Sequence, residues 1–161
     1  MPTTDNLSPG ITTLHEMTPH PFRQTFKEFP HMELHVVDMG RHRRGATDGV
    51  KNIWINLKKL QVDRRVAQAH ELIHLRRGDR GCQPETVEAR VRFEAARFLL
   101  PPATHTYRIA EALIAYELDL HQAADHLWVT YPALLHRLDR RFIHPAEYAT
   151  IERRVGEELT A

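Results

Sequence analysis

The sequence predicts an α+β protein that is mainly helical, with a small antiparallel sheet near its N-terminal end. Residues 32–37 and 50–57 are short stretches with alternating apolar residues, the pattern of strands that bury one face. After residue 60, longer segments repeat apolar residues every three or four positions, which is typical of amphipathic helices. The loop between the two strand-like stretches suggests that they pair antiparallel.

Composition indicates an ordinary globular domain. The chain has 161 residues, of which 42% are hydrophobic and 27% charged, which is enough for one core. A net charge of +1, with the basic residues spread along the chain, argues against a general nucleic-acid coat. The single cysteine, Cys82, excludes an internal disulfide and fits a reducing compartment.

No targeting or membrane segment is evident in the sequence. No apolar run approaches the ~20 residues needed to cross a bilayer. The N-terminus, MPTTDNLSPG, lacks the basic-then-apolar pattern of a secretory signal. We therefore expect a cytoplasmic protein without a membrane partner, and the sequence leaves its oligomeric state open.

The first part of the chain is expected to lead into the sheet. Residues 1–18, rich in Thr, Pro and Ser, predict a flexible N-terminal segment. Phe22, Phe26 and Phe29 then recur at helical spacing, which predicts a short amphipathic helix whose aromatic stripe joins the core. Residues 41–49, between the predicted strands, form a basic, turn-rich stretch and are expected to be a loop.

Two long helices are expected after the sheet. The first covers 63–77, with Asp63 as a plausible N-cap and Gly78 as the C-terminal stop. The second begins with Pro84 at its first position and ends before Pro101-Pro102. With the strands, these helices define a predicted core domain over 19–102.

The last third, 103–161, is expected to form a helical subdomain. Its helices are predicted at 105–117, 119–127, 132–141 and 145–158. The middle two resemble a helix-turn-helix, and Arg137, Arg140 and Arg141 are expected to give the second of them a basic side. We favour a helical cap over the core and keep contact of 119–141 with DNA or protein as the alternative.

The first long helix carries the residues with the clearest chemistry. His70 and His74 are four residues apart, so both imidazoles lie on one helix face and can reach one Zn²⁺ at about 2.0–2.1 Å. Glu71 lies beside the first ligand and can take a proton from a water on the metal. The pattern His70-Glu71-Leu72-Ile73-His74 thus predicts a zinc site with Glu71 as its general base.

A tetrahedral catalytic zinc needs a third protein ligand and one open position. A carboxylate on the next helix is the most economical choice, and Glu85 and Glu88 are one turn apart on one face. Glu94 lies about 240° further round the helix from Glu88 and should not share that ligand. Ligand spacing alone does not choose between Glu85 and Glu88.

The segments IWINLKKL, RRVAQAHELIHLRRGD and ETVEARVRFEAARFLLP, taken in this order, resemble the ImmA/IrrE family of metallo-endopeptidases, in its compact actinobacterial and phage forms. The resemblance covers roughly 36–101 and implies a zincin-like core. It also implies that Glu88 is the third metal ligand, because Glu88 stands three residues before Val91 and ahead of the Ala-Ala-x-x-Leu-Leu-Pro close. Two departures from the family pattern are Ile73, where Gly is common, and Glu94, where a bulky residue is common.

What the resemblance implies for function is zinc-dependent intracellular proteolysis of a regulatory DNA-binding protein, such as a phage or mobile-element repressor. The alternative is a non-proteolytic regulatory protein that docks a partner on the zincin core. A weaker third option is a structural metal clip, which has no use for the base Glu71.

Two further parts of an endopeptidase site can be sought in the sequence. The strand at 53–57 lies just before the active helix and could align an extended substrate by strand addition. His105, Tyr107 and Tyr116 are candidates for an oxyanion donor, although a structural role is favoured for each. The other histidines, including His42 and His121, are expected at surface or loop positions.

Overall fold

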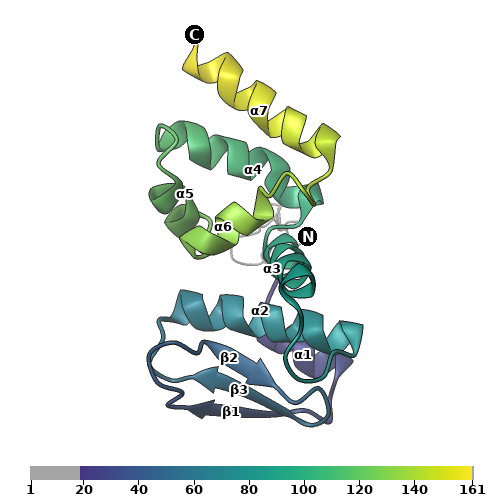
Figure 1. The fold of residues 1–161 in the computed structure, drawn as a ribbon. Helices are drawn as coiled ribbons and strands as arrows, with labels where there is room; N and C mark the ends of the chain where they lie inside the picture. The colour runs from purple at the N-terminus through teal and green to yellow at the C-terminus, as the bar shows by residue number, and fades with distance from the viewer. Residues whose placement is uncertain (1–18, 161) are drawn as a thin grey trace, which may run out of the picture.

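The computed structural model describes residues 19–160, so the predicted flexible segment at 1–18 lies outside the described residues. Figure 1 shows a small sheet with α2 across one face, and the helices α4 to α7 on the far side of α2 and α3. In chain order the elements are α1 (Pro21–Glu28), β1 (Glu33–Val37), β2 (Gly45–Thr47), β3 (Asn52–Asn56), α2 (Gln61–Arg77), α3 (Glu85–Leu99), α4 (Pro102–Ala115), α5 (Leu120–His126), α6 (Tyr131–Arg137) and α7 (Pro145–Leu159).

The sheet is mixed, with strand order β1-β3-β2, so the predicted antiparallel pairing of the two longer strands is wrong. β1 runs parallel to β3, and only β2 pairs antiparallel with β3. The reason is that the predicted loop at 41–49 contains the third strand. The chain therefore reverses twice between β1 and β3, which restores its direction.

The turn between β2 and β3 is held by one aspartate. The Oδ1 atom of Asp48 accepts hydrogen bonds from the backbone N–H groups of Val50, Lys51 and Asn52, each at 2.9 Å. A short polar side chain that satisfies successive backbone donors stabilises a tight turn. This turn fixes β2 against β3 although β2 has only three residues.

One face of the sheet packs on α1 and α2. Ile53 and Ile55 of β3 have no exposed surface and form a small core with Met32, Ala67 and Leu75. The predicted aromatic stripe of α1 is confirmed, since its phenylalanines pack against this core. The partly buried residues around the core are Phe22, Phe26, Phe29 and Leu34.

The two long helices lie close to their predicted positions. α2 begins at Gln61 with Leu60 as its N-cap, so Asp63 is in the first turn and is not the cap. Gly78 has a φ of 71° and ends α2, as predicted, because glycine tolerates this left-handed conformation without strain. Pro84 is the N-cap of α3 and not its first helical residue.

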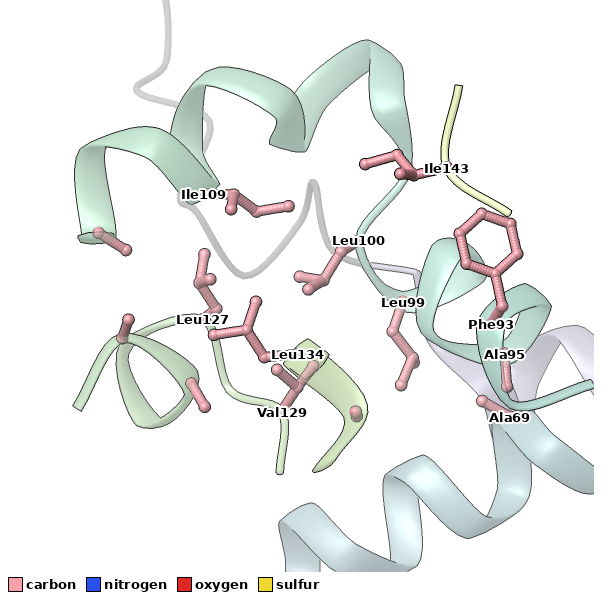
Figure 2. Packing of buried hydrophobic residues seen from close by; sticks show 14 of the residues in the cluster. Ala69, Phe93, Ala95, Leu99, Leu100, Ile109, Leu127, Val129, Leu134 and Ile143 are labelled. Atoms are coloured by element: carbon pink, nitrogen blue, oxygen red, sulfur yellow. The ribbon is translucent and has the colours of Figure 1, made fainter. Parts of the chain in front are cut away.

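The C-terminal helices share one apolar cluster with α2 and α3. Figure 2 shows Ala69 of α2 beside Ala95 of α3, and Leu99 of α3 between this pair and Leu134 of α6; with Ile109 of α4 they belong to one cluster. The cluster thus crosses residue 102, at which we predict the boundary between the core and the helical subdomain. No helix within residues 19–160 combines the length and the apolar character needed to span a membrane.

The predicted basic side of the second helix in the helix-turn-helix-like unit is not present as expected. α6 ends at Arg137, whose side chain is fully buried, with Nε donating to the Leu100 carbonyl at 2.8 Å and a guanidinium NH₂ paired with Glu147. Arg140 and Arg141 lie beyond the helix end, and Arg141 pairs with Asp139. A buried arginine needs such partners because an unpaired buried charge is costly. Arg137 therefore ties α6 to α3 and α7.

Candidate metal centre

Three potential metal ligands converge where α2 packs on α3. The Nε2 atoms of His70 and His74 lie 3.0 Å apart. The two carboxylate oxygens of Glu88 lie 3.3 Å from His70 Nε2 and 3.5 Å from His74 Nε2. One ligand atom from each of the three residues can be chosen so that all lie within 4.8 Å of one another. These three side chains could hold a metal ion.

The spacing of the three groups fits a tetrahedral ion. Ligand atoms about 2.05 Å from a tetrahedral zinc stand about 3.3 Å from each other. Each imidazole lies near this distance from one oxygen of Glu88, with His70 Nε2 3.3 Å from Oε2 and His74 Nε2 3.5 Å from Oε1. The imidazole pair at 3.0 Å needs only a small outward movement. Two imidazoles and one carboxylate are also a usual donor set for a catalytic zinc.

The structure brings Glu88, and not Glu85, to the two histidines. The Glu85 side chain is 77% exposed and pairs with Arg92. Glu94, which spacing excludes, pairs with Arg90 at 2.7 Å. The choice that ligand spacing left open is thus decided by the packing of α3 on α2, because only Glu88 faces α2 at the right level.

The second histidine is oriented by a carboxylate that our sequence analysis missed. Asp79 Oδ2 lies 3.0 Å from His74 Nδ1 and also accepts a hydrogen bond from Arg77 Nε at 2.9 Å. With Nδ1–H donating to Asp79, the lone pair of His74 is on Nε2, the atom that lies 3.0 Å from His70 Nε2 and 3.5 Å from Glu88 Oε1. Such carboxylate–histidine pairs fix the tautomer and orientation of metal ligands. The sequence signal for this role was an acidic residue, Asp79, directly after the glycine that ends α2.

We predict that Asp79→Ala weakens zinc affinity by about 10–100-fold, because removing an outer carboxylate frees the His74 ring and lowers its basicity. Competition with a chromophoric chelator measures this affinity. Arg77→Ala, which removes the other partner of Asp79, serves as the control and should retain most of the affinity. Equal losses in both variants would mean that Asp79 acts through the loop and not through His74.

Burial keeps His70 in the form that binds metals. Desolvation lowers the pKa of His70 to about 4, and the nearby His74, Arg92 and His136 add to the effect. An imidazole ligand must be neutral to donate its lone pair. At neutral pH, His70 therefore needs to lose no proton before it can ligate.

Glu71 lies next to this cluster with its carboxyl group buried, since the residue is only 6% exposed. Burial raises the pKa of Glu71 to about 8, with a further contribution from the Glu88 carboxylate. A cation bound by the neighbouring ligands would act in the opposite direction, because positive charge favours the ionised carboxylate. Glu71 thus has the tuned environment expected of a group that both accepts and releases a proton.

A glycine in β2 makes room for the Glu71 carboxyl group. A Cβ atom at Gly45 would lie 3.3 Å from Glu71 Oε1 and 3.2 Å from both the Trp54 carbonyl oxygen and Ile55 Cδ1. Those distances are tighter than ordinary van der Waals contact. The absence of a side chain at Gly45 therefore allows strand β2 to approach α2 directly beside the candidate base.

His70 and Glu71 open into a pocket of about 370 Å³. Its walls come from the segment that leads into β2, from α2 and α3, and from α6 of the C-terminal helices. His42, which is exposed in the loop before β2 as expected, lines this pocket, and His136 lines it from α6. The full lining is His42, Arg44, Gly45, Val66, Ala67, His70, Glu71, Arg92, Ala95, Ala96, Thr130, Pro132, Ala133 and His136.

None of the three predicted oxyanion-donor candidates lines this pocket. His105 is 1% exposed, with Nδ1 2.8 Å from Thr104 Oγ1 and Nε2 3.1 Å from Arg108. Tyr107 is 61% exposed, and Tyr116 contacts His126. The burial of His105 agrees with the structural role that we favoured for it. The side chains that line the pocket belong to other residues.

The predicted alignment of substrate along 53–57 is also wrong. β3 is the central strand, and both of its edges are already paired, with β1 on one side and β2 on the other. A further strand can add only at a free edge. The edge strand that reaches the pocket is β2, through Gly45.

Comparison of the chain with models of protein families, with curated proteins and with solved structures found no match. The geometry of the candidate metal site and of the pocket beside it is therefore what supports a function.

Proposed function

We propose that this protein is a zinc-dependent endopeptidase that acts in the cytoplasm. The observation that carries the proposal is the buried carboxyl group of Glu71, which lines a pocket beside the cluster of His70, His74 and Glu88. A purely structural metal site needs neither a buried acid beside its ligands nor a pocket that opens at one of them, as this pocket does at His70.

Zinc, when bound, supplies a Lewis acid that polarises a carbonyl group and brings the pKa of water to about 7. His70, His74 and Glu88 would hold the ion as three protein ligands, and Asp79 would fix the His74 ring. The Glu71 carboxylate would accept a proton from the attacking water and deliver it to the leaving amine nitrogen, as general base and then general acid.

The resemblance of the sequence to ImmA/IrrE metallo-endopeptidases supports the same reaction and suggests the substrate. On that basis we propose that the cleaved protein is a regulatory DNA-binding protein, such as a repressor of a phage or mobile element. A direct role of 119–141 in DNA contact gains no support from α6, because its terminal arginine, Arg137, is fully buried against Glu147.

The proposed function is tested with a peptide library made by chymotryptic digestion of a bacterial proteome. We expect the zinc-loaded protein to cut a defined subset of peptides, with new termini identified by mass spectrometry. Incubation with 1,10-phenanthroline should stop cleavage, and restored zinc should recover it, since the activity depends on the ion. An intact library in the presence of zinc would contradict the proposal.

A further inference from the structure

The pocket beside Glu71 is cationic at its walls. Arg44 precedes strand β2, and Arg92 comes from α3, so guanidinium groups reach the pocket from two separate parts of the fold. Both arginines lie near His136 of α6. Burial is the main cause that lowers the pKa of His136, and the positive charges of Arg92 and Arg44 lower it further. Among the lining residues, Glu71 is the sole acid, and it belongs to the proposed catalytic centre.

These two arginines are available to a ligand. Within residues 19–160, the exposed Arg44 side chain has no carboxylate within ion-pair distance. Arg92 pairs with Glu85, whose side chain is 77% exposed. An ion pair with so exposed a partner contributes little to stability and exchanges readily. Arg92 can therefore turn to another carboxylate at small cost.

Half of the other arginines have an acidic partner in the described part of the chain. Arg76 pairs with Glu28, Arg90 with Glu94, and Arg153 with Glu157. Arg44 belongs to the other half, and it lines the pocket beside Glu71. An acidic group of the substrate would supply what Arg44 lacks.

The rest of the pocket suits a side chain with an apolar stem. Val66 and Ala67 of α2, Ala95 and Ala96 of α3, and Ala133 of α6 form its apolar lining. Small and branched residues leave room for methylene groups between the α-helices. A glutamate side chain combines such a stem with a terminal carboxylate, which guanidinium groups bind through paired hydrogen bonds.

We propose that this pocket selects peptide substrates with an acidic side chain, preferably glutamate, next to the scissile bond, with Arg44 and Arg92 as the specificity-determining residues. The inference rests on the proposed endopeptidase function and names the substrate class of the same site. It also gives α6 and the segment before β2 a shared role as walls of the substrate pocket.

Profiling with the chymotryptic peptide library tests the preference. We expect cleavage sites to be enriched about tenfold for glutamate over glutamine at one position flanking the cut, as one charge-assisted bidentate contact would give. Arg44→Glu and Arg92→Glu should remove this enrichment and favour lysine at the same position. Lys27→Glu, an exposed change of equal charge on α1, should leave the profile unchanged.

The outcomes separate the two proposals. If the zinc-loaded wild-type protein cuts no peptide, the endopeptidase function fails and the substrate preference falls with it. If it cuts peptides without favouring acidic residues, or if Lys27→Glu alters the profile as much as Arg44→Glu does, only the preference is overturned. Should a charge-reversed variant not fold, Arg44→Gln and Arg92→Gln replace it, and each should reduce the enrichment for glutamate. An undiminished enrichment in both would also overturn the preference.

Discussion

Glu71→Gln is expected to reduce the rate of peptide cleavage by about 10²–10⁴-fold. Glutamine has nearly the same shape as glutamate, but its amide cannot accept and return a proton at neutral pH. The buried position of Glu71 against Gly45 leaves no room for another group to replace it there. Initial rates on a peptide selected from the library, measured at saturating zinc, give the size of the loss.

Zinc content and the midpoint of thermal unfolding should stay close to the wild-type values in Glu71→Gln, since Glu71 is not among the three proposed ligands. Glu111→Gln, on the exposed side of α4, is the matched control and should retain full activity. Cleavage that survives in Glu71→Gln would exclude Glu71 as the base. Loss of cleavage with an unchanged biological effect would favour the alternative of a regulatory binding protein.

His70→Ala, His74→Ala and Glu88→Ala are each expected to lower zinc affinity by more than about 100-fold. Loss of an outer-shell partner alone costs about 10–100-fold, so loss of a direct ligand should cost more. The distances of 3.3 and 3.5 Å from Glu88 to the two imidazoles are the basis for including the carboxylate. Competition with a chromophoric chelator measures the affinities.

Glu85→Ala provides the matched control, since it removes a carboxyl group one turn away on the same helix. Its side chain is largely exposed and pairs with Arg92, so zinc affinity should not change. The opposite pattern, with affinity lost in Glu85→Ala and kept in Glu88→Ala, would move the third ligand and contradict the geometry described above.

The helices could be predicted from the sequence because their signals are local. Apolar periodicity, the Gly78 stop and Pro101 each act within a few residues. The sheet could not, because β2 has three residues, Gly45–Thr47, within a basic and turn-rich stretch. The pairing of β2 with β3 depends on contacts along β3 and on the turn held by Asp48. Because β2 was not predicted, β1 was expected to run antiparallel to β3 and not parallel to it.

The residues of the candidate site also fall into those with a local sequence signal and those brought together only by packing. His70, Glu71 and His74 form a local pattern on one helix, so these three could be predicted from the sequence. Ligand spacing left Glu85 and Glu88 open, and only the family resemblance favoured Glu88. Arg44 and His136 meet Glu71 only through the packing of β2 and α6 around α2 and α3. The predicted basic side of α6 failed for a similar reason. We expected the Arg137 side chain to be exposed to solvent, but it is buried because Glu147, from another helix, pairs with its charge.

Anomalous diffraction at the zinc absorption edge, from crystals of the zinc-loaded protein, tests the proposed metal centre most directly. We predict one strong peak about 2.0–2.2 Å from His70 Nε2, His74 Nε2 and a Glu88 carboxylate oxygen, with no fourth protein ligand and Glu71 beside it. A peak that these three side chains do not share, or a fourth protein side chain that closes the coordination sphere, would contradict the proposal of a zinc hydrolase.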